Sequence, residues 1–308
     1  MKHNNLKGSI ILCTAALIWG LAFVAQSDAV GLVPSFMVNA LRSFVGAGAL
    51  YVFYYAVNRK QKTGFFPTEK TEKKRFLKGG TVCGVCLAIA MNFQLFGIAV
   101  YPDGVASEAR AGFLTALYVI LVPIASVFWG KKINLFVWLG VLIAVVGVYM
   151  LCFSDGFGGI YLGDILMFIC AVAFTAHIIS IDAYVGLMGG VRLSIMQFLV
   201  TGIISAVLSA VFELSQWDAG NMLQAAPQIL YLGLMSSGVA YTLQIVGQKY
   251  AEPAVASISM SLESVFAALG GWVIVGNALS GKEILGCGLV FVAIITAQLP
   301  EFSKKHTG

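Results

Sequence analysis

The chain has 308 residues, of which 59% are hydrophobic and 11% are charged, whereas soluble domains are about half apolar and about a quarter charged. This composition excludes an ordinary soluble domain and indicates an integral membrane protein. The formal net charge of +5 does not indicate nucleic-acid binding, because the basic residues lie in loops between apolar runs, where membrane topology explains them better.

Ten apolar segments follow one another, each near the roughly 20 residues that a helix needs to cross about 30 Å of hydrocarbon. The backbone of a segment in lipid must satisfy its own polar groups, and no segment alternates as a barrel strand would, so we expect helices. The first run is too long for the core of a signal peptide and is kept as a helix. The predicted fold class is all-α, with transmembrane helices at 8–27, 34–57, 77–100, 104–129, 134–153, 161–185, 192–213, 228–250, 253–276 and 281–299.

The charges of the short loops predict the orientation in the membrane. If the N-terminus is cytoplasmic, nearly all Lys and Arg residues fall in inside loops, which is the bias that cytoplasmic loops show. We therefore expect a multi-pass protein of the cell membrane with both termini in the cytoplasm. The longest inside loop, 58–76, is interpreted as a solvated basic linker. The outside loops contain Asp28, Asp103, Asp155, Asp218 and one base, Lys282.

An internal repeat divides the chain into two copies of five helices, 8–153 and 161–299. Because five is an odd number, the two copies must cross the membrane in opposite directions. Inverted repeats of this kind build transporters whose site lies near the bilayer midplane between the halves. The echoes include residues 94–97 (QLFG) with 244–247 (QIVG), Trp19 with Phe174, and Arg42 with Gln197.

Further short motifs occur in order along nearly the whole chain. They are LIWG at 17–20 with Phe23, Leu41-Arg42, Phe93-Gln94 with Gly97, GFLTALYV at 112–119 with Val122-Pro123, WLG at 138–140, Ala240-Tyr241 with Gln244, and Leu262-Glu263 with Val265-Phe266. On these motifs the chain resembles the drug/metabolite transporter superfamily, specifically the EamA-type permeases with ten helices in two five-helix repeats. The resemblance implies a secondary transporter that moves a small organic metabolite by alternating access. Export of an amino acid or related compound, with proton exchange as the coupling, is implied by the resemblance alone.

Two positions depart from the family pattern. Relatives often carry Pro directly after the glutamate of the ninth helix, where this chain has Ser264, and Glu at the outer end of that helix, where it has Asn277. Without the Pro, a kink is lost and a backbone hydrogen bond is restored. The sequence therefore leaves open whether the ninth helix bends, and no carboxylate role is assigned to Asn277.

Ionisable residues inside apolar segments are the first candidates for a site, because a charge in hydrocarbon is costly unless it faces protein or water. Arg42 either holds a substrate carboxylate or phosphate in a forked pair or joins Glu108 to hold two helices together. We expect Arg110 to contact substrate, with an ion pair to Glu108 as the alternative, although residues i and i+2 of one helix do not face each other. Glu263, near the midplane, either contacts substrate and exchanges protons or fixes helix packing.

Other candidates are weaker. His177 is a possible proton relay because imidazole titrates near neutrality, and a histidine satisfied by a neighbouring hydroxyl is the simpler interpretation. Asp164 and Asp182 lie near the ends of the sixth helix, where the water interface explains them. With Glu108 and Glu263, His177 completes the proton-coupling candidates. Polar and aromatic residues expected to contact substrate are Gln94, Gln244, Trp19, Tyr118 and Tyr241, although rings in such segments more often serve packing or face lipid.

Enzymatic and cofactor chemistry find no support in the motifs. The pair Cys83 and Cys86 lies in an apolar segment with no second pair and no His cluster, so a zinc or thioredoxin-like role is not expected. There is no P-loop, zinc-protease helix or nucleophile elbow, and no soluble domain large enough to bind a nucleotide. We therefore predict a transporter that is not an enzyme, has no cofactor, metal or catalytic residue, and uses a gradient.

The expected partners are a small-molecule substrate and the lipid bilayer, not nucleic acid or nucleotide, and a homodimer is left open. One alternative is a multidrug or organic-cation efflux carrier, because Glu263 with aromatic walls suits a cation almost as well as two arginines suit a carboxylate. The alternatives without transport are an intramembrane enzyme built on Glu263, His177 and Glu108, and a membrane partner protein.

Overall fold

The computed structural model describes the backbone of residues 5–59, 64–102, 107–153, 159–270, 272–273 and 279–305, and the side chains of all but 107–109 and 300–305 of these. Within these ranges the chain forms helices and no strand. The elements are α1 (Asn5–Val30), α2 (Ser35–Asn58), α3 (Lys70–Ala99), α4 (Ser107–Ala116), α5 (Tyr118–Phe128), α6 (Leu135–Cys152), α7 (Leu162–Met188), α8 (Gly190–Phe212), η1 (Leu214–Gln216), α9 (Ala219–Gln224), α10 (Ala226–Tyr231), η2 (Leu232–Ala240), α11 (Tyr241–Gln248), α12 (Pro253–Met260), α13 (Leu262–Gly270) and α14 (Gly281–Lys305).

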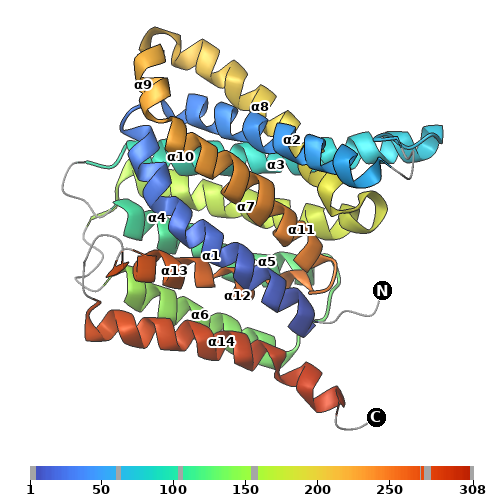
Figure 1. Ribbon diagram of the computed structural model, residues 1–308. Coiled ribbons are helices and arrows are strands. Elements are labelled where there is room, and N and C mark those ends of the chain that lie inside the picture. The colour runs from blue at the N-terminus through green and yellow to red at the C-terminus, as the bar shows by residue number, and fades with distance from the viewer. Residues whose placement is uncertain are drawn as a thin grey trace.

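Ten spans in the described part of the chain are long and apolar enough to cross a membrane. Their order confirms the predicted all-α membrane fold, and most of their ends lie within three residues of the predicted ones. An even number of crossings returns the chain to the side where it began, and Figure 1 shows both termini at the same end of the bundle. Seven spans are single helices, whereas Arg110–Phe128, Ala226–Gln248 and Pro253–Gly270 each combine two or more elements.

The prediction of a solvated linker over 58–76 is wrong for its second part. Helix α3 begins at Lys70, so residues 70–76 are helical, while 60–63 lie outside the described residues. Phe65 and Phe76 are buried, with ring centroids 5.6 Å apart. The guanidinium of Arg192 lies over the Phe76 ring and donates to the Phe65 carbonyl. The charged residues lower the hydropathy of this stretch, but Lys and Glu are good helix formers, and the two rings anchor it to the bundle.

The two halves of the chain interlock. Helix α1, from the first half, packs against α11, α12 and α13 of the second half, and α3 packs against α7 and α8. Helix α2 packs along α8 and η2. Both halves therefore share one interior, and a site at their boundary receives side chains from each.

Three spans are interrupted, and two of the interruptions occupy matching places in the halves. The fourth span breaks at Leu117 between α4 and α5, and the ninth breaks at Ser261 between α12 and α13. The eighth widens into the π-helical segment η2. The ninth span thus departs from a regular helix without the Pro that relatives carry. The Ser261 hydroxyl donates to the Ile258 carbonyl over 2.7 Å, a local bond that competes with helical pairing.

Helices α6 and α14 approach to backbone contact through glycines. A Cβ atom added to Gly286 would lie 2.7 Å from the Gly147 carbonyl oxygen, and one added to Gly147 would lie 2.9 Å from the Gly286 carbonyl oxygen. Small residues of this kind allow membrane helices to pack closely where no hydrophobic effect drives them together. Gly288 lies two residues further along the same helix, and a Cβ atom added to it would meet no atom within 4 Å.

We expect Gly286→Ala to destabilise the protein, because the added methyl group meets a backbone atom that cannot rotate away. Overpacking of this kind typically costs about 1–3 kcal/mol, which a lower thermal unfolding midpoint in detergent will report. Gly288→Ala is the matched control and is expected to be neutral or slightly stabilising, since glycine inside a helix costs about 0.5–1 kcal/mol relative to alanine. Equal midpoints for the two variants would contradict the close contact between α6 and α14.

Candidate functional site

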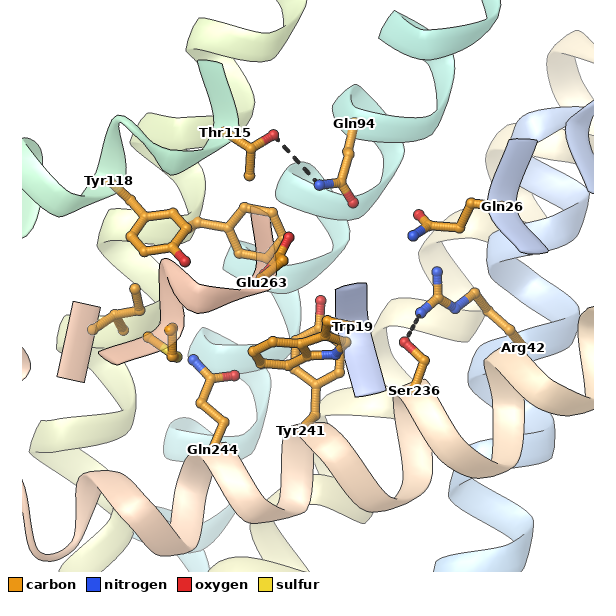
Figure 2. A pocket seen from close by; sticks show the side chains of 13 residues that line it. Trp19, Gln26, Arg42, Gln94, Thr115, Tyr118, Ser236, Tyr241, Gln244 and Glu263 are labelled. Carbon is orange, nitrogen blue, oxygen red and sulfur yellow. Dashed lines mark hydrogen bonds between the residues drawn. The ribbon is translucent and has the colours of Figure 1, made fainter. Parts of the chain in front are cut away.

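A pocket lies where the two halves meet, beside all three interrupted spans. Its cavity volume is about 40 Å³, which is room for on the order of one to three water molecules. In this conformation the free space in the pocket is thus smaller than a metabolite. Figure 2 shows its lining side chains, which are Trp19, Gln26, Arg42, Gln94, Thr115, Tyr118, Phe174, Ile178, Ser236, Tyr241, Gln244, Met260 and Glu263.

Arg42 on α2 brings a positive charge to the pocket. Only 3% of the residue is exposed, and its guanidinium donates to two hydroxyl groups of η2, from Nη2 to Ser236 over 2.7 Å and from Nε to Ser237 over 3.2 Å. No carboxylate of the described residues pairs with it. The π-helical segment thus holds the guanidinium in place with neutral partners, and no described residue supplies a counter-charge.

Glu263 brings a carboxylate to the same pocket. It belongs to α13, just after the break in the ninth span. It lies in the first turn of α13 and is half-buried. Among the described residues no hydrogen bond or ion pair to its carboxylate is present. The positive end of the α13 dipole favours a negative charge at this position, but no cationic side chain neutralises it there.

Several polar atoms of the pocket also lack partners. Trp19 Nε1, Gln26 Oε1 and Gln244 Oε1 are buried without a hydrogen bond to any described residue. Gln94 donates from Nε2 to the Thr115 hydroxyl over 3.4 Å, a long bond. Buried polar groups are nearly always satisfied in native proteins, and an unsatisfied one typically costs about 1–3 kcal/mol. A polar ligand in the pocket would satisfy these three groups.

Aromatic rings form the remaining wall. The rings of Trp19 and Tyr241 meet edge to face with centroids 4.7 Å apart, and those of Tyr118 and Phe174 lie 6.5 Å apart. Phe198 supports Tyr241 from behind at 5.3 Å. Figure 2 shows the Trp19 and Tyr241 rings beside Gln244, on the opposite side of the pocket from Thr115 and Gln94.

The repeat accounts for the pocket's frame but not for its charges. Trp19 and Phe174, which fall opposite each other in the two copies, both line the pocket, as do Gln94 and Gln244. Arg42 lines it too, but its counterpart Gln197 does not. The Gln197 Oε1 atom instead lies 3.0 Å from His177 Nε2. The two halves therefore contribute similar rings and amides, and Arg42 and Glu263 break the symmetry.

Seven of the eight predicted substrate contacts line this one pocket, and Arg110 is the exception. Its guanidinium forms a forked pair with Asp164, from Nε to Oδ1 over 2.9 Å and from Nη2 to Oδ2 over 2.5 Å. Asp164 is only 6% exposed, so the interpretation of this carboxylate as an ordinary interfacial residue is wrong. The pair joins α4 of the first half to α7 of the second. Sequence reasoning missed it because partners 54 residues apart have no local pattern.

Tyr101 completes the Arg110–Asp164 pair. Its hydroxyl donates to Asp164 Oδ1 over 2.8 Å, and the Tyr161 amide donates to Oδ2 over 2.9 Å. Burial and the bond to Asp164 raise the pKa of the Tyr101 hydroxyl well above its ordinary value, so the group stays a donor at every physiological pH. The Arg110 guanidinium also lies over the Tyr161 ring, 4.8 Å from its centroid. These contacts hold the two halves together at the end of the bundle opposite the termini.

The proton-coupling candidates do not gather in the pocket. His177 is fully buried behind it, paired with Gln197 and 6.2 Å from Tyr241 between ring centroids. The Nε2 atom of His177 thus has a neighbouring partner, an amide and not a hydroxyl, whereas its Nδ1 atom is buried without a partner among the described residues. The Glu108 side chain and Asn277 lie outside the described residues. Glu263 is thus the proton-coupling candidate that the structure places in the pocket.

Six pocket residues were not predicted as substrate contacts. Phe174 could have been predicted, because the repeat places it opposite Trp19. Ser236 had no sequence signal, because a π-helical widening is not visible as a pattern. The others are Gln26, Thr115, Ile178 and Met260.

The family model described as the EamA-like transporter family matches the chain twice, over residues 6–153 and 161–297. The first match contains the first five spans and the second contains the sixth to the tenth, the last of them nearly to its end. Five crossings per copy reverse the direction of the second copy relative to the first. The two matches thus agree with an inverted repeat.

Individual relatives match almost the whole chain. An Archaeoglobus fulgidus protein named uncharacterized transporter is 29% identical over 96% of this chain and 87% of its own length. The uncharacterized inner membrane transporter YedA of Escherichia coli is 24% identical over 93% and 89%. A crystal structure of another protein matches with a TM-score of 0.75 at 22% identity, over 95% of this chain and 96% of that one, which shows a shared fold.

We expect Asp164→Asn to lower the thermal unfolding midpoint strongly, because it removes the carboxylate that pairs with the buried Arg110 guanidinium. Loss of one partner of a buried pair typically costs about 3–5 kcal/mol. The matched control is Asp182→Asn, which breaks the pair with Lys131, whose side chain is 43% exposed. A pair exposed to this degree is worth about 0–1 kcal/mol, so the control midpoint should hardly change. Similar midpoints for both variants would show that Asp164 does not hold the halves together.

Proposed function

Because the chain belongs to the EamA-like transporter family, we propose that it is a secondary transporter of a small zwitterionic metabolite, an amino acid or a close relative, working by alternating access. The observation that carries this proposal is the pocket itself. It holds one cation, Arg42, and one carboxylate, Glu263, which come from opposite halves of the chain and have no counter-charge among the described residues.

The chemistry of the pocket favours a ligand with both signs of charge. A buried charge is costly unless it is paired, and the guanidinium fork of Arg42 binds a carboxylate with two parallel bonds when it has free donors. Glu263 supplies the partner for an ammonium group. A zwitterion satisfies both residues at once, whereas a simple acid or a simple cation leaves one of them unpaired. The Trp19 and Tyr241 rings provide an apolar surface for the rest of the ligand.

The small free volume of the pocket supports alternating access. A cavity of about 40 Å³ admits no metabolite, so the halves must separate on one side to load it and on the other to empty it. The breaks at Leu117 and Ser261 let α4 and α13 move without the rest of their spans. Discontinuous helices at matching positions of two inverted repeats are typical of such sites.

Export is the direction we propose, on the resemblance to exporters of amino acids and related metabolites.

We place the protein in the cell membrane with both termini in the cytoplasm, because the basic residues gather on the side of the termini. A reporter protein that fluoresces only in the cytoplasm, fused after residue 308, should be bright. High activity of an alkaline phosphatase fused at the same place, which is active only in the periplasm, would reverse the proposed orientation.

A carrier of organic cations is the second candidate. Glu263 with the Trp19 and Tyr241 rings forms a setting that suits a cation, and such a carrier has no use for Arg42. An intramembrane enzyme fits the pocket less well, because His177 pairs with Gln197 and not with Glu263. The described residues also hold no cluster of three or more His, Cys, Asp or Glu side chains for a metal.

Ligand-induced stabilisation of the purified protein tests the substrate class. We expect amino acids to raise the thermal midpoint more than the matching amines or carboxylic acids, because only the zwitterion pairs both charges. A ligand at 100 times its dissociation constant adds about 2.7 kcal/mol to the native state. Arg42→Gln should abolish the effect of zwitterions, and Lys131→Gln, a change at an exposed base, should preserve it.

The same panel separates the candidates. Stabilisation by cations alone, lost in Glu263→Gln and kept in Arg42→Gln, would replace the metabolite transporter with the cation carrier. Arg42→Lys keeps the charge but loses the fork, so it shows whether weakened binding reflects charge or geometry. A well-folded Arg42→Lys variant that binds zwitterions as tightly as the native protein would contradict a forked contact.

Proton exchange through Glu263 predicts a separate result. In proteoliposomes, Glu263→Gln should abolish accumulation of substrate driven by a pH gradient, because an amide cannot bind and release the proton. Exchange of labelled for unlabelled substrate, which needs no net proton movement, should persist if the ligand still binds. Glu252→Gln, at the start of the same span but outside the pocket, is the control. Gradient-driven accumulation by Glu263→Gln would remove Glu263 from the coupling.

A further inference from the structure

A groove on the outer surface of the bundle is separate from the pocket. It has a volume of about 440 Å³, within the range of about 300–1,000 Å³ that small-molecule sites occupy. It lies between α1 of the first half and α13 and α14 of the second. Its walls include Ser9, Thr14 and Leu17 of α1, Phe266 of α13, and Ile295 and Gln298 of α14.

The groove opens toward lipid. Three apolar residues that line it are well exposed: Ile10 at 61%, Leu17 at 42% and Ile295 at 60%. All three lie inside the membrane spans Asn5–Val30 and Gly281–Leu299. What fills the groove therefore comes from the bilayer.

The length of the groove matches one leaflet. It runs along α1 from Leu6 to Leu17, a separation of eleven positions, or about 16 Å at the helical rise of about 1.5 Å per residue. This is about half of the roughly 30 Å of hydrocarbon in a bilayer. One end of the groove is thus at the membrane surface on the side of the termini, and the other is near the midplane.

The polarity of the groove walls changes along its length in the same order as that of a phospholipid, from polar at the membrane surface to apolar near the midplane. At the surface end, Gln298 donates to the Ser9 hydroxyl over 2.5 Å and Ser259 donates to it over 2.7 Å. Gln298 is only 2% exposed, and its Oε1 atom has no hydrogen-bond partner among the described residues. Lys7 lies at this end, with its ammonium 4.2 Å from the centroid of the Tyr250 ring. At the midplane end the walls are Leu17 and Phe266, without polar groups.

We propose that this groove binds one acyl chain of a glycerophospholipid from the leaflet on the side of the termini. The chain lies along α1 toward Leu17, and the ester and headgroup region lies by Gln298 and Lys7. Figure 1 shows α1 and α14 drawing together toward the end that carries the N-terminus. Since α1 belongs to one half and α13 and α14 to the other, the bound chain touches both halves at once and biases their relative movement.

Photolabelling in lipid nanodiscs tests the proposal. The discs contain phosphatidylethanolamine and phosphatidylglycerol, with a trace of phospholipid bearing a diazirine near the end of one chain. We expect labelling around Leu17 and Phe266 to exceed, severalfold, labelling of the α8 surface at Ile203 and Val207, which are 56% and 57% exposed. Thr14→Trp fills the groove and should reduce its labelling severalfold, whereas Val207→Trp on α8 should not.

Three results would overturn the proposal. Equal labelling of the groove and of α8 would mean ordinary annular lipid. Undiminished labelling in Thr14→Trp would place the lipid elsewhere, and stronger labelling of the groove by a photoreactive free fatty acid than by the phospholipid would reject the phospholipid as occupant. Ile10→Trp, which fills the groove from an exposed position, replaces Thr14→Trp if the latter is not recovered as a monodisperse protein.

Discussion

In hydrocarbon every backbone N–H and C=O group must find a partner within the protein, and this constraint shapes the whole molecule. It makes each crossing a helix and permits an irregular backbone only where the freed groups face protein or a cavity. The three interrupted spans all border the same pocket, with the breaks at Leu117 and Ser261 and the widened η2 around it. Three buried polar atoms without a hydrogen-bond partner among the described residues, on Trp19, Gln26 and Gln244, belong to side chains that line this pocket.

The two buried arginines differ in whether a described carboxylate pairs with them. Arg110 and Arg42 are 5% and 3% exposed, so both have lost most of their hydration. Arg110 is paired with Asp164, whose carboxylate also accepts from Tyr101 and from a backbone amide. Among the described residues, Arg42 has the hydroxyls of Ser236 and Ser237 as its side-chain partners. The described part of the chain thus supplies a carboxylate to Arg110 and none to Arg42, which leaves Arg42 able to bind an anionic group of a ligand.

Much of this arrangement was predictable from the sequence, and the limits are instructive. Hydropathy and length determine the ten spans, and the repeat relates Trp19 to Phe174 and Gln94 to Gln244, so the frame of the pocket followed from pattern alone. What pattern could not predict is partner choice across the bundle. Arg110 meets Asp164, and Arg42 meets Ser236, through packing of helices that are distant in sequence. The aromatic anchors Phe65 and Phe76 lie within a charged run. A hydropathy average over this run is dominated by its many lysines and does not reveal the two rings.

The contacts that close the two ends of the bundle are unequal in kind. Opposite the termini, α7 and α4 are joined by the Arg110–Asp164 ion pair, whereas α1 and α12, the equivalent helices of the inverted arrangement, are joined by the Ser259 and Ser9 hydroxyls. Breaking a neutral hydrogen bond costs about 0.5–1.5 kcal/mol net, but leaving a buried charge unpaired costs about 3–5 kcal/mol. The inverted repeat alone would make the two openings equivalent. In the alternating-access transporter that we propose, these unequal contacts favour separation on the side of the termini, so a ligand has to supply differential binding energy mainly for the opposite opening.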